Sequence, residues 1–261
     1  MTIEQQNIQL YDQWLNTEKG RFLFSRQKKI IVELTAPNPG CTVLNVGCRA
    51  GHYLRLFRDE KCAVSGTDRS EILLGAARER LGTAADLRRA RPEELPFADN
   101  EFDLVTLIHV LETCADPQRA LAEAIRVSRR LVFIGLMNPH ALFGTKQRIK
   151  ALVGLPISGP TRYFRRRELA LTITKVMDSA SITWGSAIYL PDFFYTFFSE
   201  LEEALPWKNN PLGAFVGMVF PVKYTYRTAQ NPILSVFDMK AKSAQATAPE
   251  AVRGMMRETD V

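Results

Sequence analysis

The sequence predicts an α/β protein in which helices cover both faces of a mostly parallel, twisted sheet. Two observations carry this prediction. Short apolar, β-branched runs alternate with helical segments over the first half of the chain, and glycine-containing turns join several of them. Strands separated by helices form parallel sheets with right-handed crossovers. The 261 residues suit one large domain, or one domain with an elaborated lid.

The expected elements begin with a helical cap over residues 3–34, where apolar residues recur at roughly helical spacing. We expect a break near Gly20, and the run Pro37–Gly40 ends the cap. The strands that follow are expected at Thr42–Val46, Cys62–Gly66, Phe102–Ile108 and Leu131–Gly135. The intervening helices are expected at His52–Asp59, Glu71–Leu81 and Pro117–Val127.

The regular alternation ends after Asn138. Residues 139–160 are rich in glycine, proline and basic residues, which break long helices. Beyond them we expect a helix at Arg167–Met177, a strand at Thr183–Leu190, a helix at Phe193–Leu205 and a strand at Gly213–Tyr226.

The formal net charge of +6 is concentrated in one stretch rather than spread over the chain. Its basic residues are Lys146, Arg148, Lys150, Arg162, Arg165, Arg166 and Arg167. Such a stretch can face phosphates, an acidic substrate or an anionic membrane surface. It can equally be a solvated loop. Because no nucleic-acid recognition module accompanies it, we expect no nucleic-acid partner.

The cysteines and the termini indicate the compartment. The four cysteines form no C-x-x-C pair and show no metal-finger spacing, so we expect reduced core thiols and no metal site. Residues 1–16 are polar and acidic, unlike a signal peptide. The richest apolar run, 187–198, is interrupted by Pro191 and Asp192 and is too short to span a bilayer. We therefore expect a cytoplasmic protein.

The strongest motif is V-L-N-V-G-C-R-A-G at residues 43–51, where a buried strand enters a glycine turn that opens a helix. Gly47 and Gly51 allow backbone to approach a ligand, and the helix N-terminus offers free N–H groups. The NAD fingerprint G-x-G-x-x-G requires another glycine between them, which disfavours an NAD enzyme. Asp68 ends the next strand, where a carboxylate can accept hydrogen bonds from ribose hydroxyls. Its alternative role is to cap the following helix.

A third segment, E-E-L-P-F-A-D-N-E-F-D-L-V at 93–105, is followed by H-V-L-E at 109–112 and by Asp116-Pro117. The order of these segments resembles the class I S-adenosylmethionine-dependent methyltransferases, in particular the bacterial small-molecule branch of type 11. That family shows V-L-D-V-G-C-G-T-G, an acidic second-strand end, G-D-A-E-x-L-P-F and then H-V-L-E-H. The resemblance runs from about Tyr11 to Asn138 and implies a Rossmann-like fold with an N-terminal helical cap and a lid inserted after the fifth strand.

The resemblance also implies S-adenosylmethionine as the cofactor, and the residues that bind it. Those at its methionine end would be Asn45, Gly47, Cys48 and Gly51, and those at its ribose Asp68 and Arg69. Those beside its adenine would be Pro92 and Glu93, and those near the reacting sulfur Ile108 and His109. The expected regions are a cap (1–39), a cofactor-binding core (40–137), a basic lid or substrate region (138–182), the last strands with their helix (183–240) and a mobile tail (241–261).

Three positions depart from the family pattern. Asn45 replaces an acidic residue, Arg49 replaces a glycine, and Arg91 replaces an aspartate that accepts from the adenine amine. Arginine has donors only, so Arg91 should stack on the adenine or turn to solvent. If the Arg49 position needs a positive φ, a side chain there costs about 1 kcal/mol. These departures leave open a second interpretation, a protein that binds the cofactor without catalysis.

Methyl transfer needs a general base only when the acceptor must lose a proton. His109 is the first candidate, since it follows the fourth strand and histidine titrates near neutrality; Tyr11 and His140 are weaker ones. The alternative is that His109 only packs against the cofactor. The acceptor pocket is expected between the cap and residues 138–190, where aromatic and basic residues suit a small amphipathic or acidic molecule. Neither the acceptor atom nor the oligomeric state follows from the sequence.

Overall fold

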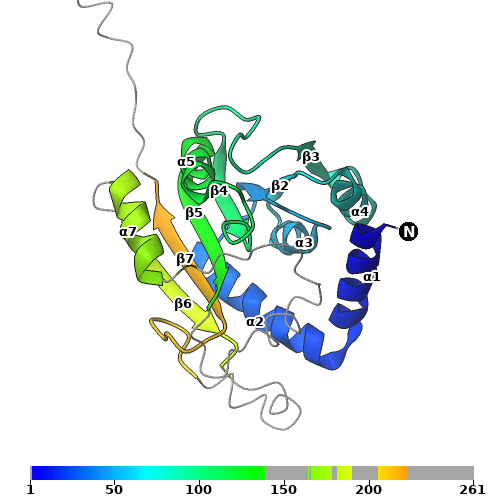
Figure 1. Ribbon diagram of the computed structural model, residues 1–261, viewed down its shortest axis with the longest axis horizontal. Helices are drawn as coiled ribbons and strands as arrows, with labels where there is room; N and C mark the ends of the chain where they lie inside the picture. The colour runs from blue at the N-terminus through cyan, green and yellow to red at the C-terminus, as the bar shows by residue number, and fades with distance from the viewer. Residues whose placement is uncertain (1, 139–163, 165, 178–180, 190–204, 223–261) are drawn as a thin grey trace, which may run out of the picture. The chain divides into compact units, whose positions relative to one another are not determined.

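The computed structural model describes residues 2–138, 164, 166–177, 181–189 and 205–222 (Figure 1). His140, most of the expected lid, all but the last residue of the expected helix Phe193–Leu205, and the expected tail lie outside the described residues. The described residues contain two helices of the cap and a seven-stranded sheet.

The sheet has the strand order β3-β2-β1-β4-β5-β7-β6. Its strands are β1 (Thr42–Val46), β2 (Ala63–Asp68), β3 (Ala85–Arg89), β4 (Phe102–Ile108), β5 (Ser128–Met137), β6 (Thr183–Ala187) and β7 (Phe215–Pro221). All pairs from β3 to β5 are parallel, and β7 runs antiparallel to both β5 and β6. The predicted Rossmann-like, mostly parallel sheet is therefore confirmed.

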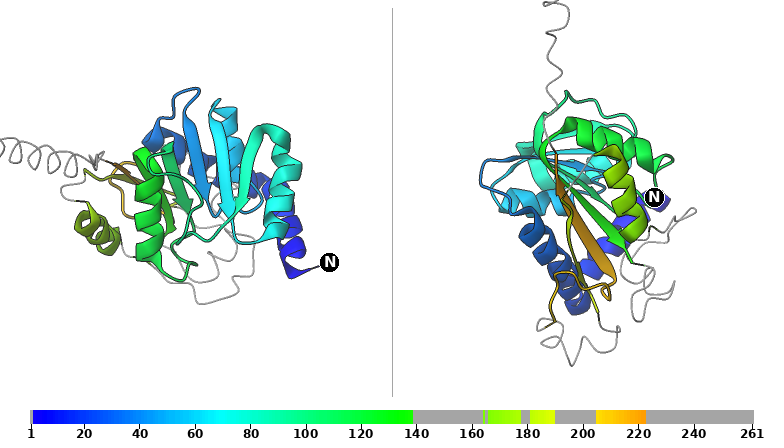
Figure 2. Two further views of the ribbon diagram at one scale, coloured as in Figure 1. Left: turned by 90° about the horizontal axis from the view of Figure 1, so that it is seen from above. Right: turned by 90° about the vertical axis from the view of Figure 1, so that its left-hand side faces the viewer.

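Helices cover both faces of this sheet (Figures 1 and 2). The helices α2 (Glu18–Thr35), α3 (His52–Asp59) and α4 (Glu71–Leu81) contribute to one buried cluster, around Leu23, Leu54 and Leu74. On the opposite face, α5 (Pro117–Val127) and α7 (Arg166–Val176) contribute to a second cluster, around Leu121 and Ile173. The cap helix α1 (Ile3–Asn16) packs against α2 and α4.

The break in the cap lies at Thr17, three residues before the predicted position. The Thr17 hydroxyl donates to the Trp14 carbonyl at 2.6 Å and accepts the Gly20 N–H at 3.0 Å, so it ends α1 and caps α2. A Cβ on Gly20 would overlap the Trp14 carbonyl. The glycine is therefore needed for the tight corner, although it lies inside the first turn of α2 rather than at the break.

Strand β3 has no counterpart among the strands expected from the sequence. Its residues, Ala-Asp-Leu-Arg-Arg, are half-buried or exposed, because β3 is an edge strand. Such a strand lacks the apolar run that marks a central strand. The other differences concern strand ends: β2 extends two residues further than expected, to Asp68, and β5 is longer at both ends, Ser128–Met137. Strands β6 and β7 are shorter than expected, Thr183–Ala187 and Phe215–Pro221.

The cysteines are all free thiols, as expected, and two of them are neighbours. The Cys41 and Cys62 sulfurs lie 3.3 Å apart at the start of β1 and β2. Among the described residues, no group of three or more His, Cys, Asp or Glu side chains is arranged to hold a metal ion. In the same part of the chain, no helix is both long and apolar enough to cross a membrane.

Candidate functional site

The turn after β1 is the centre of the candidate site. Gly47 has φ +65°, Arg49 has φ +52°, and Gly51, with φ +82°, caps the start of α3. Arg49 thus has the positive φ whose cost was foreseen from the sequence. A Cβ on Gly47 would come within 2.6 Å of Val110 Cγ2, so this turn packs directly against the residues that follow β4. The positive φ values at positions 47 and 49 explain why the family pattern has glycine at both of them.

Asp68, at the end of β2, is joined to this turn. Its Oδ2 accepts the Arg49 N–H at 2.9 Å, and its Oδ1 accepts the Ser70 N–H at 3.0 Å. Ser70 is the residue that caps α4, through its hydroxyl, so the alternative role considered for Asp68 falls to Ser70. Burial raises the pKa of Asp68, while the two N–H donors and the Arg49 charge oppose the rise. The carboxylate is held rigidly at the carboxyl edge of the sheet.

Asn45 lies on β1, two residues before Gly47, and is 1 % exposed. Its side-chain nitrogen is buried and has no hydrogen-bond partner within the described residues. A buried donor without a partner costs about 1–3 kcal/mol. The position therefore fits a ligand that brings an acceptor atom to the end of β1.

The loop before β4 contains the residues predicted to flank the adenine. Glu93 Oε1 accepts the N–H groups of Ala115 and Asp116 at 2.8 and 3.1 Å, which ties the loop to the start of α5. Arg91 is exposed, as expected for a group that cannot accept from an amine. Arg69 is also exposed, and its carbonyl accepts from Arg89 Nε at 3.1 Å.

The second half of the site follows β4. His109 has φ +58°, and its N–H donates to the Gly135 carbonyl at 2.9 Å. Its Nδ1 lies 3.2 Å from Glu112 Oε2, and Glu112 Oε1 accepts the Met137 N–H at 2.7 Å. The His109 ring also meets the Phe215 ring edge-on, with centroids 5.6 Å apart. Glu112 belongs to the H-V-L-E motif, but no role was predicted for it, although a His–Glu pair three residues apart was the available signal.

The cap reaches the same edge of the sheet through Asp12. Both Asp12 oxygens accept from Arg80 Nη2 at 2.8 Å, and His52 Nε2 lies 2.7 Å from Oδ1. Burial, followed by the Arg80 charge, lowers the pKa of His52 to about 4, so His52 is neutral at pH 7. These contacts fasten α1 to α3 and α4 beside the turn after β1.

Tyr11, the weaker catalytic candidate, lies in this part of the cap. Its ring packs edge-on against His52 at 4.8 Å between centroids. Burial raises the pKa of Tyr11 to about 12, with Arg49 opposing the shift. The phenol therefore keeps its proton at neutral pH, which suits a hydrogen-bond donor better than a base.

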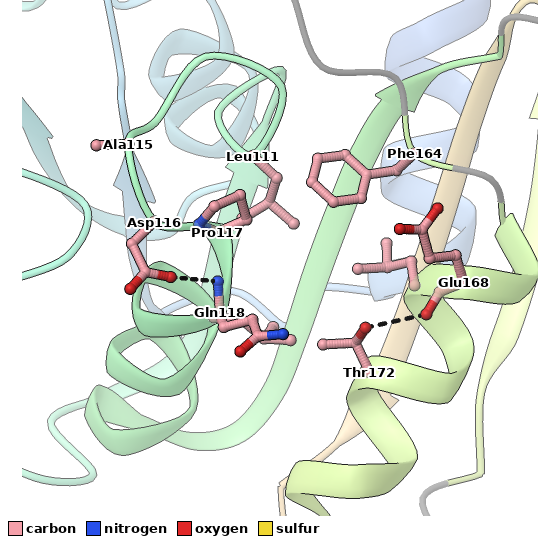
Figure 3. A pocket seen from close by; sticks show the side chains of 10 residues that line it. Leu111, Ala115, Asp116, Pro117, Gln118, Phe164, Glu168 and Thr172 are labelled. Carbon is pink, nitrogen blue, oxygen red and sulfur yellow. Dashed lines mark hydrogen bonds between the residues drawn. The ribbon is translucent and has the colours of Figure 1, made fainter.

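Two cavities lie on the side of the sheet covered by α5 and α7. The first, about 360 Å³, is bounded by Leu111, Asp116 and Pro117 on one side and by Phe164, Glu168 and Thr172 on the other (Figure 3). The second, about 370 Å³, is lined at the end of β5 by Leu136, Met137, Asn138, Phe164, Arg166, Arg167, Trp184, Pro211 and Val216. The Arg166 guanidinium stacks over the Trp184 ring at 4.0 Å. This second cavity combines apolar walls with two cationic groups.

Comparisons with known proteins agree with this geometry. Residues 44–133 match the family model described as a methyltransferase domain. The chain is 34% identical over 107 residues to a phosphatidylethanolamine N-methyltransferase of Cereibacter sphaeroides, covering 39% of this chain and 52% of that protein. It is 33% identical over 129 residues to a ubiquinone biosynthesis O-methyltransferase of Thiobacillus denitrificans, covering 47% of this chain and 54% of that protein. The chain thus spans about half the length of the curated relatives that it matches.

Among solved structures, the fold is similar to that of a methyltransferase of Thermotoga maritima described as S-adenosylmethionine-dependent and as a possible histamine N-methyltransferase. The TM-score is 0.65 at 21% identity, over 85% of this chain and 99% of that one. The strand order and this likeness define a class I methyltransferase fold. More narrowly, residues 44–133 are similar to the methyltransferase-domain family that the sequence predicts, and their fold is that of a methyltransferase described as S-adenosylmethionine-dependent.

Proposed function

We propose that the chain is an S-adenosylmethionine-dependent methyltransferase that acts on a small amphipathic or acidic molecule. The observation that carries the proposal is the junction of the glycine turn with Asp68 through the Arg49 N–H, because it joins the ends of β1 and β2 into one rigid rim. The cofactor supplies an electrophilic methyl group when bound. The protein has to hold the acceptor in line with it and exclude water.

The residues proposed to hold the cofactor come from four strand ends. Asn45, Gly47, Cys48 and Gly51 would contact its methionine end, where the buried Asn45 amide could donate to the methionine carboxylate. Asp68 would accept from the ribose hydroxyls, next to Arg69. Pro92 and Glu93 would border the adenine. Ile108 and His109 would lie near the reacting sulfur.

The proposed class of methyl acceptor rests on the descriptions of the relatives and on the side chains that line the cavity at the end of β5. The curated relatives are described as acting in ubiquinone biosynthesis, on demethylmenaquinone or on phosphatidylethanolamine. The cavity at the end of β5, with its aromatic walls and Arg166 and Arg167, suits a molecule with an apolar body and an anionic or electron-rich head. The proposed acceptor is therefore an aromatic or lipid-like small molecule.

Calorimetric titration tests the cofactor part of the proposal. S-adenosylmethionine and S-adenosylhomocysteine should bind to the purified chain, and NAD should not. Asp68→Ala should weaken both, with circular dichroism showing whether the variant stays folded. Binding of NAD alone would overturn the proposal, and equal binding by Asp68→Ala would overturn the ribose assignment.

A cofactor-binding protein without catalysis is the second candidate, favoured by the departures at Asn45, Arg49 and Arg91. The discriminating measurement is release of S-adenosylhomocysteine in the presence of acceptors. The panel should contain catechols, demethylated hydroquinones with short prenyl tails, and ethanolamine phospholipids. Tight cofactor binding with no turnover of any member would favour the second candidate.

A further inference from the structure

We infer that Glu112 is a positioning residue that holds His109 in one tautomer, with Nε2 free to take a proton from the methyl acceptor. This inference rests on the proposed function and narrows it. The acceptor would be a group that carries a proton at neutral pH, and a phenol or another hydroxyl is the simplest case. His109 was a candidate base from the sequence, and the structure supplies the partner that would make it one.

The contact between His109 and Glu112 determines which nitrogen of the imidazole carries the proton. His109 Nδ1 lies 3.2 Å from Glu112 Oε2. An ionised carboxylate can only accept, so Nδ1 must carry the proton in this contact. In the neutral ring the lone pair then lies on Nε2. Within the described residues, no hydrogen bond to Nε2 is present.

His109 and Glu112 are both held in place by contacts with β5. Glu112 is 4 % exposed, and its other oxygen accepts the Met137 N–H at 2.7 Å. On the other side, the His109 backbone is fixed by its N–H bond to Gly135 and by its positive φ. Residues held at a positive φ by the surrounding structure cluster at active sites and ligand-binding sites. The pair is thus anchored to β5 at both residues.

His109 lies beside the glycine turn that follows β1. Strand β4 is the immediate parallel neighbour of β1, with Leu107 beside Val46. The residue after His109, Val110, packs against Gly47. His109 therefore borders the turn proposed to hold the methionine end of the cofactor, at the carboxyl edge where such folds bind ligands.

In the proposed reaction, His109 acts as the base and the methyl group moves from sulfur to the acceptor oxygen. His109 Nε2 takes the hydroxyl proton while the oxygen forms its bond to the methyl carbon. The carbon–sulfur bond breaks, and its electron pair remains on sulfur, which becomes a neutral thioether. The imidazolium formed on His109 lies beside the Glu112 carboxylate, which stabilises the new positive charge.

Glu112→Gln gives a sharp test because the amide has one acceptor and one donor. The Met137 N–H and a His109 Nδ1–H both need an acceptor, and glutamine can serve only one of them. If the amide oxygen keeps the Met137 contact, its NH2 group donates to Nδ1 and moves the imidazole proton to Nε2. The variant should thus reverse the tautomer with almost no change in side-chain size.

The measurement is ¹⁵N NMR of histidine-labelled protein bound to S-adenosylhomocysteine, with the His109 signal assigned by its loss in His109→Phe. Wild type should show the Nδ1–H form, and Glu112→Gln the Nε2–H form. With a demethylated hydroquinone as acceptor, Glu112→Gln should lower kcat by roughly 100-fold or more. Its affinity for S-adenosylhomocysteine should stay within about threefold. Glu112→Asp, which keeps a carboxylate, should retain more activity, and the exposed Glu79→Gln is the matched control.

The double variant His109→Phe/Glu112→Gln should be no slower than His109→Phe, because a positioning residue acts only through the residue that it positions. An Nε2–H tautomer in the wild type, or full turnover by Glu112→Gln, would overturn the role of Glu112 with cofactor binding intact. Failure of the wild type to bind S-adenosylmethionine would instead overturn the proposed function.

Discussion

The turns after β1 and β4 are neighbours at one edge of the sheet, and each contains a non-glycine residue with positive φ, Arg49 at +52° and His109 at +58°. The first turn is organised through backbone groups: the Arg49 N–H binds Asp68, and the Cys48 N–H binds the Thr67 carbonyl. The second is held by a backbone bond, from the His109 N–H to the Gly135 carbonyl, and in addition by a contact between two side chains, the His109 ring and Glu112.

The two turns therefore differ in whether these contacts are made by backbone groups of the turn alone or also by one of its side chains. Where backbone atoms make the contacts, the side chain can change, and the chain has arginine at a position where the methyltransferase pattern has glycine. Where side chains make the contacts, each residue type matters. We therefore expect substitutions after β1 to act through space and φ, and substitutions after β4 to act through the chemistry of the side chain.

The largest expected effect is that of Gly47→Ala. The added Cβ would lie 2.6 Å from Val110 Cγ2 at a φ of +65°. The free energy of unfolding should fall by roughly 2–4 kcal/mol, and cofactor affinity should fall at least about tenfold. Denaturant unfolding and calorimetry measure the two. Gly40→Ala, at φ +83° with nothing within 4 Å, is a control for strain alone. Adding Val110→Ala should restore part of the loss, and no recovery would show that the contact with Val110 is unimportant.

Asp68→Asn should be next in size. Asparagine can accept only one of the N–H groups of Arg49 and Ser70, and it lacks the charge for the ribose contacts. Cofactor binding should weaken by roughly 1.5–3 kcal/mol, about 10- to 100-fold. Asp59→Asn, on the exposed end of α3, is the matched control.

The pH dependence follows from the same carboxyl group. Burial raises the pKa of Asp68 above the ordinary value of 3.8, so ionisation of this carboxyl group in the folded protein is shifted to higher pH. Its contribution to folding stability is then present at low pH and is lost as pH rises through the raised pKa. Ribose binding needs the ionised form of Asp68. As pH is lowered, cofactor affinity should therefore begin to decline at a higher pH than it would with an aspartate of ordinary pKa. Affinity that is constant down to the usual aspartate range would contradict this assignment.

Arg91→Asp should have a smaller effect, in the opposite direction. The exposed arginine would be replaced by an acceptor for the adenine amine, and affinity for S-adenosylmethionine should rise roughly tenfold. Arg91→Ala, which removes the guanidinium without adding an acceptor, separates the two contributions. Weaker binding by both variants would mean that Arg91 itself contacts the cofactor.

The smallest expected effect is that of Arg49→Gly, which should stabilise the protein by about 1 kcal/mol because it relieves a positive φ. Thermal unfolding should shift upward by about 2–4 °C. The N–H bond to Asp68 remains, so cofactor affinity should change by less than about threefold. Lys61→Gly, at φ +62° away from the site, should stabilise in the same way. A large loss of affinity in Arg49→Gly alone would show that the side chain belongs to the site after all.

The places of Gly47 and Asp68 in the fold could be predicted from the sequence because they depend on local geometry. Gly47 and Asp68 each end a strand recognisable by its apolar run, and parallel strands bring their ends to one edge. No role was predicted for Glu112, because only the folded chain shows that its second oxygen is held by the Met137 N–H, 25 residues away. Strand β3 was also missed, because its half-exposed residues carry no apolar pattern, and the break of the cap was predicted near Gly20, three residues after Thr17, the residue that ends α1. The assignment of individual residues to the cofactor stays a prediction.

The position of β7 has a consequence for how the protein is made. This strand, Phe215–Pro221, is inserted between β5 and β6, although it is the last of the strands described to be synthesised. Until it leaves the ribosome, β5 has an open edge and the pockets for Phe215 and Phe220, both fully buried in the finished fold, are unfilled. Residues 44–133, which match the methyltransferase domain, are therefore translated well before β7 can complete the sheet. The nascent chain passes through a stage with an unpaired hydrophobic strand, and such strands are prone to aggregation.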